Sequence, residues 1–173
     1  MHPLPSSPAA MDAPVDGALF RAGMRRLAAS VCLITACDAG QRHGLVATSV
    51  SSLAAEPPSL IACVHRSASA HGPLRQAGAF CVNLLGTRHE ELALLFSDPD
   101  RRDRRFETAD WTALTTGAPV LADAVAAFDC RLERVVEHAT HAILIGTVLD
   151  IRIDDSGDPL IHADRRFTRL AAR

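Results

Sequence analysis

The stretch AAFDCRLERVVEHATHAILIGTVLDIRI, residues 126–153, indicates the fold class more clearly than any other part of the sequence. Within it, FDCRLE at residues 128–133 alternates apolar with charged side chains, which is the pattern of a β-strand with one buried face. HAILIGTVLDIRI, residues 141–153, predicts a second long strand of the same kind. These segments therefore predict that the second half of the chain is mainly β-structure.

Shorter strand patterns lie on both sides of this pair. They are VCLITA (31–36), GLVATSVSSL (44–53), SLIACV (59–64), AFCVNLL (79–85) and PLIH (159–162), the last one following a DDSGD turn. Helical patterns are short and cover about 16–27, 73–76 and 89–96. About seven strands without long helices between them predict a mainly β protein, an antiparallel barrel with a few short helices.

Length and composition indicate one globular domain. The 173 residues include 48% hydrophobic and 22% charged side chains, which is an ordinary balance for a folded protein. A chain of this length is expected to form one domain, here residues 16–173, around a single core. Residues 1–15 are rich in proline and carry no signal-peptide pattern, so we expect a disordered N-terminal tail there.

Charge and cysteine content limit the possible partners and the location. A net charge of −2 and a pI near 6.4 provide no basic field, so no nucleic acid or anionic lipid partner is expected. No apolar run approaches the roughly 18 residues that cross a bilayer, so no membrane association is expected. The five cysteines are scattered and lie mostly within apolar runs, which favours free thiols in a reducing cytoplasm.

Several common functional motifs are missing from the sequence. It contains no GxGxxG after a predicted strand, no GxxxxGK[ST] and no GxSxG. His138 and His141 have HxxH spacing, but no CxxC or HExxH accompanies them, so no metal site is expected.

The segment GLVATSVSSLAAEPP, residues 44–58, concentrates hydroxyl side chains in apolar surroundings. One interpretation is an edge strand that runs into a double-proline turn, where Ser and Thr bond to nearby backbone. The other is a binding site, in which hydroxyls and backbone N–H groups meet a phosphate and small side chains admit a flat ring. Asn83 presents a similar choice between a structural bridge and a ligand contact, because its neighbours predict that it is buried. SDPDRRDRR, residues 97–105, is expected to be a solvated loop rather than a phosphate-binding patch.

Five dispersed segments, taken in order, resemble a known family. They are ATSVSS (47–52), CVHRSASAH (63–71), FCVNLL (80–85), THAILIGTV (140–148) and PLIHADRRF (159–167). Their order and spacing are similar to those of the short-chain flavin reductases, which fold as FMN-binding split barrels. The resemblance runs from about Phe20 to Phe167. Within the family, the chain resembles the reductase components of 4-hydroxyphenylacetate 3-monooxygenases. The segments GAPVL (117–121) and FDCRL (128–132) are also similar to those of the flavin reductases of pyrimidine utilisation.

The resemblance implies a set of site residues. Ala47, Thr48, Ser49 and Val50 would line the isoalloxazine ring, and Ser51 or Ser52 would reach the ribityl phosphate together with Arg66, Ser67 and Ser69. His141 would act on the nicotinamide side as the catalytic residue, and Phe167 matches an aromatic position of the family. Asn83 completes the expected cofactor-binding set.

The sequence also departs from the family pattern. Ala139 replaces a glycine before Thr140 and His141, and His162 and Ala163 replace an aromatic pair. The chain contains no tyrosine. How the nicotinamide or adenine stacks, and the choice between NADH and NADPH, therefore stay open.

The resemblance implies an NAD(P)H-dependent flavin reductase. Such an enzyme transfers hydride from the nicotinamide to FMN, or to FAD, and supplies reduced flavin to a partner monooxygenase. It also implies a homodimer with flavin near the subunit boundary. The alternatives are an FMN-containing reductase of a directly bound substrate such as a corrinoid, and a non-catalytic flavin- or haem-binding split-barrel protein.

Overall fold

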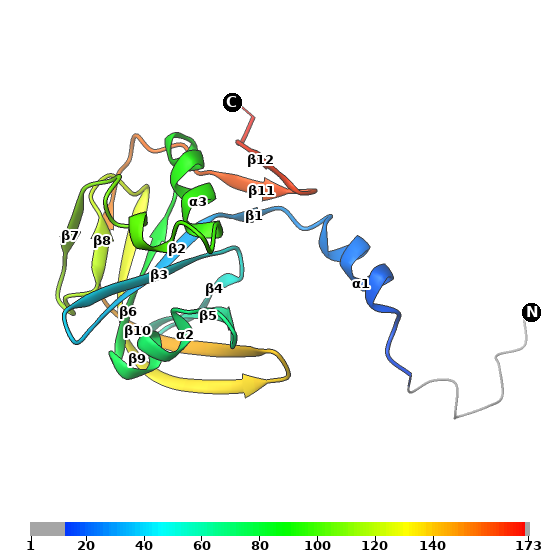
Figure 1. Cartoon of the computed structure of the whole chain (residues 1–173), viewed down its shortest axis with the longest axis horizontal. Coiled ribbons are helices and arrows are strands. Elements are labelled where there is room, and N and C mark those ends of the chain that lie inside the picture. The colour runs from blue at the N-terminus through cyan, green and yellow to red at the C-terminus, as the bar shows by residue number, and fades with distance from the viewer. Residues whose placement is uncertain (1–12, 172–173) are drawn as a thin grey trace, which may run out of the picture.

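The structure is a computed structural model that describes residues 13–171. It is built around a seven-stranded antiparallel sheet with the strand order β3-β2-β6-β9-β10-β5-β4 (Figure 1). These strands are β2 (Cys32–Asp38), β3 (Gln41–Ala47), β4 (Val50–Ala55), β5 (Pro58–His65), β6 (Ala79–Leu84), β9 (Ala126–His138) and β10 (His141–Ile153). The predicted antiparallel β-barrel is therefore confirmed.

Smaller elements surround this sheet. Strands β1 (Ala29–Ser30), β11 (Ile161–Ala163) and β12 (Arg166–Thr168) form one small sheet, and β7 (Trp111–Ala113) pairs with β8 (Pro119–Leu121). The helices are α1 (Gly17–Met24), α2 (His71–Gln76) and α3 (Glu90–Ser97), with 3-10 turns at η2 (Thr87–His89) and η3 (Arg102–Arg104). No helix in residues 13–171 is long and apolar enough to cross a membrane.

The barrel closes at a break between β3 and β4. The segment 44–53 was expected to be one strand, and this expectation is wrong at Thr48 and Ser49, which belong to neither strand. The physical reason is that β3 pairs with β2, whereas β4 pairs with β5 at the opposite edge of the sheet. The chain must therefore leave one edge and join the other. There the Ser49 carbonyl accepts a hydrogen bond of 2.9 Å from the Cys63 N–H.

The core has two main parts on opposite faces of β2. One fills the barrel and includes the buried Ile34, Phe80 and Leu144. The other includes Leu33 and Phe96 and lies between β2 and α3. Because β2 is covered on both faces, its sequence is a continuous apolar run rather than an alternating one.

The long β9–β10 hairpin confirms the two strands expected in residues 126–153. A register shift occurs between Ile145 and Gly146. A Cβ at Gly146 would lie only 2.6 Å from Cζ of the fully buried Phe80, so the aromatic ring occupies the space that a side chain would need. The glycine therefore allows a phenylalanine to fill the barrel.

Two segments near the ends of the chain differ from expectation. The predicted N-terminal helix is present as α1, but all its residues are exposed and it stands away from the barrel (Figure 1). The last predicted strand, 159–162, is observed as β11, and β12 follows it without having been predicted. Most of the expected tail, residues 1–12, lies outside the described residues.

The loop 97–105 is not wholly solvated as expected, because Arg105 is buried. Its guanidinium donates hydrogen bonds to the carbonyl oxygens of Gly44 at 3.0 Å and Asp98 at 3.3 Å. It also lies over the Phe96 ring at 5.6 Å from the centroid. The guanidinium is thus paired by backbone and ring rather than by a carboxylate, and burial lowers the pKa of Arg105.

Candidate active site

A cavity of about 420 Å³ lies beside the break between β3 and β4, and we call it the seam cavity. Its apolar wall includes Leu45, Val46 and Ala47 from β3. Thr48 and Ser49 add two hydroxyl side chains, both exposed. Because β3 is an edge strand, the backbone groups on its outer edge have no sheet partner. The Gly44 carbonyl is taken by Arg105, and the remaining groups can meet a ligand.

Two histidines from neighbouring strands form one side of the seam cavity. His65 ends β5 and His141 begins β10, and the two are register partners whose rings meet edge to face with centroids 4.9 Å apart. Nδ1 of His65 accepts a hydrogen bond of 3.1 Å from the Ser67 N–H, so its other nitrogen carries the proton in the neutral ring. Nδ1 of His141 lies 2.9 Å from Oγ1 of Thr140. Both rings are therefore held in place by adjacent residues.

A third imidazole comes from the small sheet. His162 on β11 and Phe167 on β12 are register partners with ring centroids 5.8 Å apart, and both line the seam cavity. The cavity thus combines aromatic rings with apolar strand residues. Such a site suits a flat ring that carries polar groups at its edge.

The structure brings only part of the expected site to the seam cavity. Ala47, Thr48 and Ser49 lie there with His141 and Phe167, as the resemblance implied. The remaining expected β4 residues line a second cavity, of about 470 Å³, at the open end of the barrel, and we call it the mouth cavity. They are Val50, Ser51 and Ser52, and Thr48 lines both cavities. The strand break explains the division, because the chain passes from one cavity to the other at Thr48 and Ser49.

The expected phosphate-binding residues Arg66, Ser67 and Ser69 lie directly after His65, and none of them is among the residues that line the seam cavity. The Arg66 guanidinium pairs with Glu137 at 3.5 Å and donates a 3.2 Å hydrogen bond to the Ala139 carbonyl. The Ser67 hydroxyl lies 2.7 Å from Nδ1 of His65. Arg66 and Glu137 are both partly exposed, so their ion pair is weak and does not exclude a phosphate.

Asn83 lies away from both cavities, and its contacts in the structure are those of a structural bridge. Its side chain is fully buried and offers no surface to a ligand in this structure. Oδ1 accepts a 2.7 Å hydrogen bond from the Leu121 N–H, and Nδ2 donates to the Leu33 carbonyl at 3.3 Å and to Oγ1 of Thr35 at 3.1 Å. The amide joins the barrel to the β7–β8 hairpin.

Sequence reasoning missed His65 and Cys63, which also line the seam cavity. Both belong to CVHRSASAH, a segment that was recognised, but their partner His141 is distant in sequence. Only the pairing of β5 with β10 brings His65 next to His141. A single sequence contains no signal for that register.

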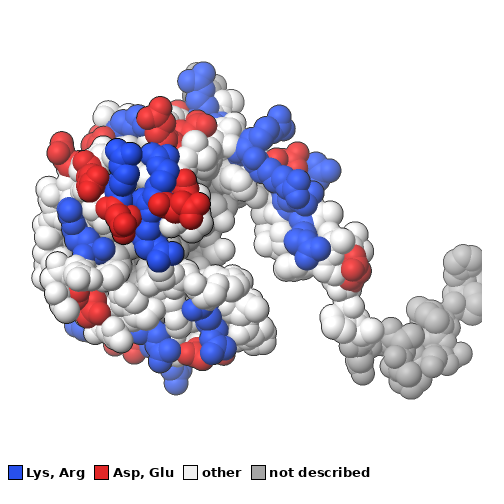
Figure 2. All heavy atoms as spheres, viewed as in Figure 1, with Lys and Arg blue, Asp and Glu red and all other residues white. Residues whose placement is uncertain are grey.

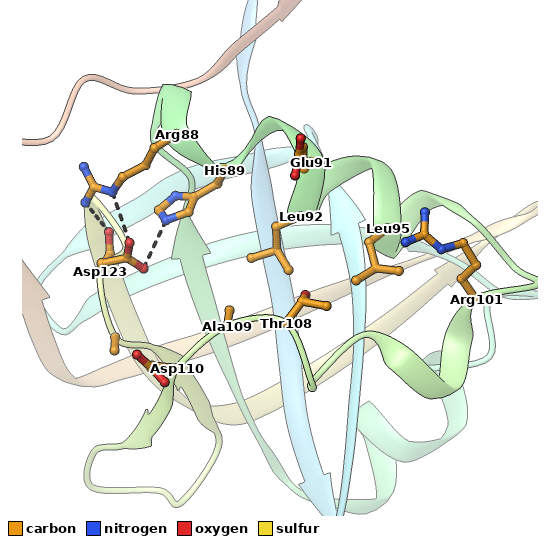
Figure 3. Close-up of a pocket in the computed structure, with 11 residues that line it drawn as sticks. Arg88, His89, Glu91, Leu92, Leu95, Arg101, Thr108, Ala109, Asp110 and Asp123 are labelled. Carbon is orange, nitrogen blue, oxygen red and sulfur yellow. Dashed lines mark hydrogen bonds and ion pairs between the residues drawn. The ribbon is translucent and has the colours of Figure 1, made fainter.

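A separate polar cavity of about 460 Å³ lies between α3, the loop after η3 and the β8–β9 connection (Figure 3). Figure 3 shows Arg88 and His89 converging on Asp123, with distances of 3.2 Å from Nε of Arg88 and 3.0 Å from Nε2 of His89. Arg88 also pairs with Asp154 at 2.9 Å. Burial opposes ionisation of Asp123, but hydrogen bonds from His89 and Arg88 outweigh it and lower the pKa of this carboxyl. These groups pair with one another, so we interpret them as a structural clamp between loops.

Comparison with known proteins identifies the family. Residues 24–171 match the model of the flavin reductase like domain. The chain belongs to the flavin reductase family. It is 40% identical over 151 residues to the FMN reductase (NADH) RutF of Agrobacterium fabrum, covering 87% of each chain. It is 42% identical over 159 residues to RutF 1 of Methylorubrum extorquens, covering 91% of this chain and 78% of that protein.

Solved structures of the flavin reductase family agree with the fold. The NADH:FAD oxidoreductase SgcE6 of Streptomyces globisporus C-1027, in complex with NAD and FAD fragments, superposes with a TM-score of 0.84 at 28% identity. The alignment covers 90% of this chain and 93% of that one. BorF, the flavin reductase component of a bacterial two-component tryptophan halogenase, gives 0.83 at 30% identity, with coverage of 91% and 100%.

The residues of the seam cavity fit a flavin. Its volume lies within the range of roughly 300–1,000 Å³ typical of small-molecule sites. The Thr48 and Ser49 hydroxyls form no side-chain hydrogen bond within residues 13–171, so a ligand can use them. The apolar wall of β3 suits the ring face, and the free backbone groups at the edge of β3 suit the polar ring edge.

Proposed function

We propose that this chain is an NADH-dependent flavin reductase that reduces FMN or FAD and supplies reduced flavin to a partner monooxygenase. The seam cavity is the observation that carries the proposal, because it combines a ring-sized apolar wall, free hydroxyls and paired histidines. The relatives named FMN reductase (NADH) support NADH as the reductant. The relatives support both flavins, since one solved neighbour is an NADH:FAD oxidoreductase.

The side chains of the seam cavity would position two flat rings against each other. A bound flavin supplies the ring atom that accepts hydride. Ala47 is small enough to let a ring approach β3, and Thr48 and Ser49 would hydrogen-bond to its polar groups. His141 would orient the nicotinamide, and His65 would hold the imidazole of His141 through their edge-to-face contact. No strong acid or base is needed, because positioning and exclusion of water account for most of what the protein contributes.

The phosphate of FMN would lie beyond this ring site. Arg66, Ser67 and Ser69 remain the proposed donors, because they follow His65 directly and Arg66 is half-exposed, with 49% of its side chain accessible. Ser51 and Ser52 are the second proposed set, since they lie on β4 just past Ser49. A phosphate gains from several N–H and O–H donors together with one guanidinium.

We further propose a homodimer in the cytoplasm. Ile151 lines the mouth cavity and is exposed. Leu53 on β4 and Ile153 on β10 are apolar and exposed as well, and a second copy would cover these side chains. All five cysteines are free thiols, in line with a reducing compartment. The partner would be a flavin-dependent monooxygenase that receives the reduced flavin by diffusion.

The proposal is tested by purifying the chain and measuring NADH oxidation with and without added FMN or FAD. We expect oxidation that depends on added flavin and saturates with it. A yellow protein that oxidises NADH only when another acceptor, such as a corrinoid, is added would favour direct reduction of a bound substrate. Flavin or haem binding without NADH oxidation would show a non-catalytic binding protein.

A further inference from the structure

The turn between β9 and β10 leads into His141, the histidine that the proposed function places on the nicotinamide side. This turn consists of Ala139 and Thr140, because His138 ends β9 and its register partner His141 begins β10. The hairpin projects from the barrel at this end (Figure 1). The position of the His141 ring therefore depends on what holds the turn.

The turn has a backbone conformation that its own sequence does not favour. Ala139 has a φ angle of 47°, in the left-handed region that glycine adopts freely and alanine rarely. Conformations of this kind persist where surrounding contacts fix them. The turn in front of His141 therefore depends on contacts from elsewhere in the chain.

Arg66 supplies two such contacts. Its backbone N–H donates a 2.9 Å hydrogen bond to the Thr140 carbonyl, one residue past the end of β5 at His65. Its guanidinium donates a 3.2 Å hydrogen bond to the Ala139 carbonyl. Both carbonyl oxygens of the turn thus accept hydrogen bonds from one residue, and the second of these bonds depends on the arginine side chain.

The Arg66 guanidinium is itself held in place by an acidic residue of the hairpin. Glu137, near the end of β9, pairs with Arg66 at 3.5 Å and with Arg75 of α2 at 2.9 Å. Figure 2 shows basic and acidic side chains next to one another in this lower part of the molecule, over α2 and the hairpin. A guanidinium has five N–H donors in a fixed fork, so it can bind a carboxylate and a carbonyl together. Arg66 therefore connects β5 both to the end of β9 and to the turn.

Two contacts of the His141 ring come from residues next to these bonds. Oγ1 of Thr140 lies 2.9 Å from Nδ1 of His141, and the His65 ring meets the His141 ring edge to face. Thr140 is part of the turn, and His65 directly precedes Arg66. A displacement of the turn would therefore move His141 in two ways, through its own backbone and through the hydroxyl beside its ring.

We propose that Arg66 is a positioning residue for His141, and this inference rests on the proposed function for the role of His141. Arg66 does not line the seam cavity, so it acts through the turn rather than by touching the nicotinamide. It thereby links the segment that would bind the flavin phosphate to the histidine that would orient the reductant. Loss of the guanidinium should let the turn and the His141 ring shift, and small displacements of reacting rings are costly in rate.

The first test compares Arg66→Met with the matched control Arg75→Met. Both arginines are half-exposed and pair with Glu137, but within residues 13–171 the Arg75 side chain makes its hydrogen bond to Glu137 alone. Stopped flow measures the reduction of FMN by NADH at saturating concentrations of both, so that weaker binding does not contribute to the rate. We expect Arg66→Met to be at least fivefold slower than the wild type and Arg75→Met to stay within twofold of it. Thermal melting establishes that both variants fold.

The second test is a double-mutant cycle with His141→Ala. If Arg66 acts through His141, Arg66→Met should slow flavin reduction by less than twofold once the histidine has been removed. An equal loss in the wild-type and His141→Ala backgrounds would overturn the inference, because Arg66 would then act independently of His141, on the flavin phosphate or on the fold.

Riboflavin separates positioning from phosphate binding, because it carries the flavin ring without the phosphate. Arg66→Met should lose at least fivefold in the rate of riboflavin reduction as well. A loss confined to FMN, or wild-type rates in the folded Arg66→Met variant, would contradict the positioning role. Failure of the proposed function would look different, because the wild type would then reduce no flavin with NADH.

Discussion

At the scale of single residues, Asn83 connects elements that are distant in the sequence. Replacing it with alanine would leave the buried Leu121 N–H and the Leu33 carbonyl without their side-chain partner. We expect Asn83→Ala to lower the free energy of unfolding by about 1–3 kcal/mol, the usual effect of an unsatisfied buried group. Urea unfolding measures this, and flavin affinity below the transition should stay unchanged. Weaker flavin binding with normal stability would instead restore Asn83 to the binding site.

Ser51 and Ser52 should behave in the opposite way. Both are exposed, and the only side-chain hydrogen bond either of them makes within residues 13–171 runs from the Ser51 hydroxyl to the Ser52 carbonyl at 3.2 Å. The double variant S51A/S52A should therefore melt like the wild type. If the hydroxyls hold the flavin phosphate, its affinity should fall by about 1–3 kcal/mol for each lost charge-assisted bond. Flavin titration by fluorescence quenching gives the affinity, and a destabilised double variant with normal affinity would mean a structural role.

His141 is the residue we expect to act on the nicotinamide. It is exposed at the start of β10 and touches the ring of His65, so its removal should not disturb the core. His141→Ala should lower the rate of flavin reduction by NADH or raise the NADH concentration needed, by about tenfold to a hundredfold, because small displacements of reacting rings are costly. Flavin binding should change little.

Stopped-flow reduction of bound flavin separates the outcomes for His141. The control is His138→Ala. His138 is the register partner of His141 on β9, and it does not line the seam cavity. Equal rates and equal NADH dependence in wild type and His141→Ala would remove this histidine from the site. Weaker flavin binding with a normal rate of hydride transfer would show that His141 contacts the flavin and does not orient the nicotinamide.

At the scale of elements, Arg88 links η2 to the loops after β8 and β10 through Asp123 and Asp154. Hydrogen bonds from Ser156 and Arg88 lower the pKa of Asp154 to about 2, and the pKa of Asp123 is also lowered. A carboxyl whose folded pKa is depressed stabilises the fold above its ordinary pKa, and this stability disappears as the pH falls through the folded value.

Arg88→Met should therefore reduce the melting temperature by a few degrees at pH 7, and the difference should shrink as the pH falls from about 4 toward 2. Thermal melts of both proteins across this range test it. Arg104→Met removes a longer, exposed pair with Glu107 at 3.8 Å and should change little at any pH. A difference between Arg88→Met and the wild type that is independent of pH would show that the alkyl part of Arg88 matters rather than its charge.

The elements also show how far a single sequence can predict this fold. The long strand β10 was predicted because more and less buried residues alternate along much of its length. β9 was predicted from the alternation in residues 128–133, but the expected exposed face is wrong at Asp129, which is fully buried because it accepts hydrogen bonds from Thr116. The break at Thr48 and Ser49 was not predicted, because each half of the segment 44–53 has the pattern of a strand. Only the tertiary pairing, of the first half with β2 and of the second half with β5, divides the segment. The burial of Arg105 was missed for a similar reason, since its partners are the backbone of Gly44 and the ring of Phe96.

At the scale of the whole molecule, composition and strand pattern predicted a mainly β barrel, but not which exposed apolar surfaces a partner covers. The apolar spacing in α1 predicted a helix, yet the structure leaves Leu19 and Phe20 exposed. In the same way, the closure of the barrel places some of the site residues predicted from the resemblance in the seam cavity and others in the mouth cavity, and Arg66, Ser67 and Ser69 line neither. Positions of this kind depend on contacts between segments, which a periodic pattern does not contain.

The homodimer is the prediction that belongs to this scale. Ile151 and Ile153 are 45% and 66% exposed on one face of β10, and Leu53 on β4 is 52% exposed, next to the mouth cavity. A stable interface buries roughly 800 Å² on each partner, so an apolar rim around a concave surface is a suitable centre for one. Two aspartates in I151D/I153D would have to be buried without partners in the dimer. We therefore expect this variant to be monomeric and the wild type dimeric in sedimentation at micromolar concentration.

The control for the dimer is Leu94→Asp, which places one negative charge, against two in I151D/I153D, on an exposed apolar position of α3 that does not line the mouth cavity. It should sediment like the wild type. Because Ser51 and Ser52 lie in the same cavity as Ile151, the monomeric variant should also bind flavin more weakly if the partner completes the site. A wild-type protein that sediments as a monomer with full reductase activity would exclude both the dimer and any contribution of a second subunit to the flavin site.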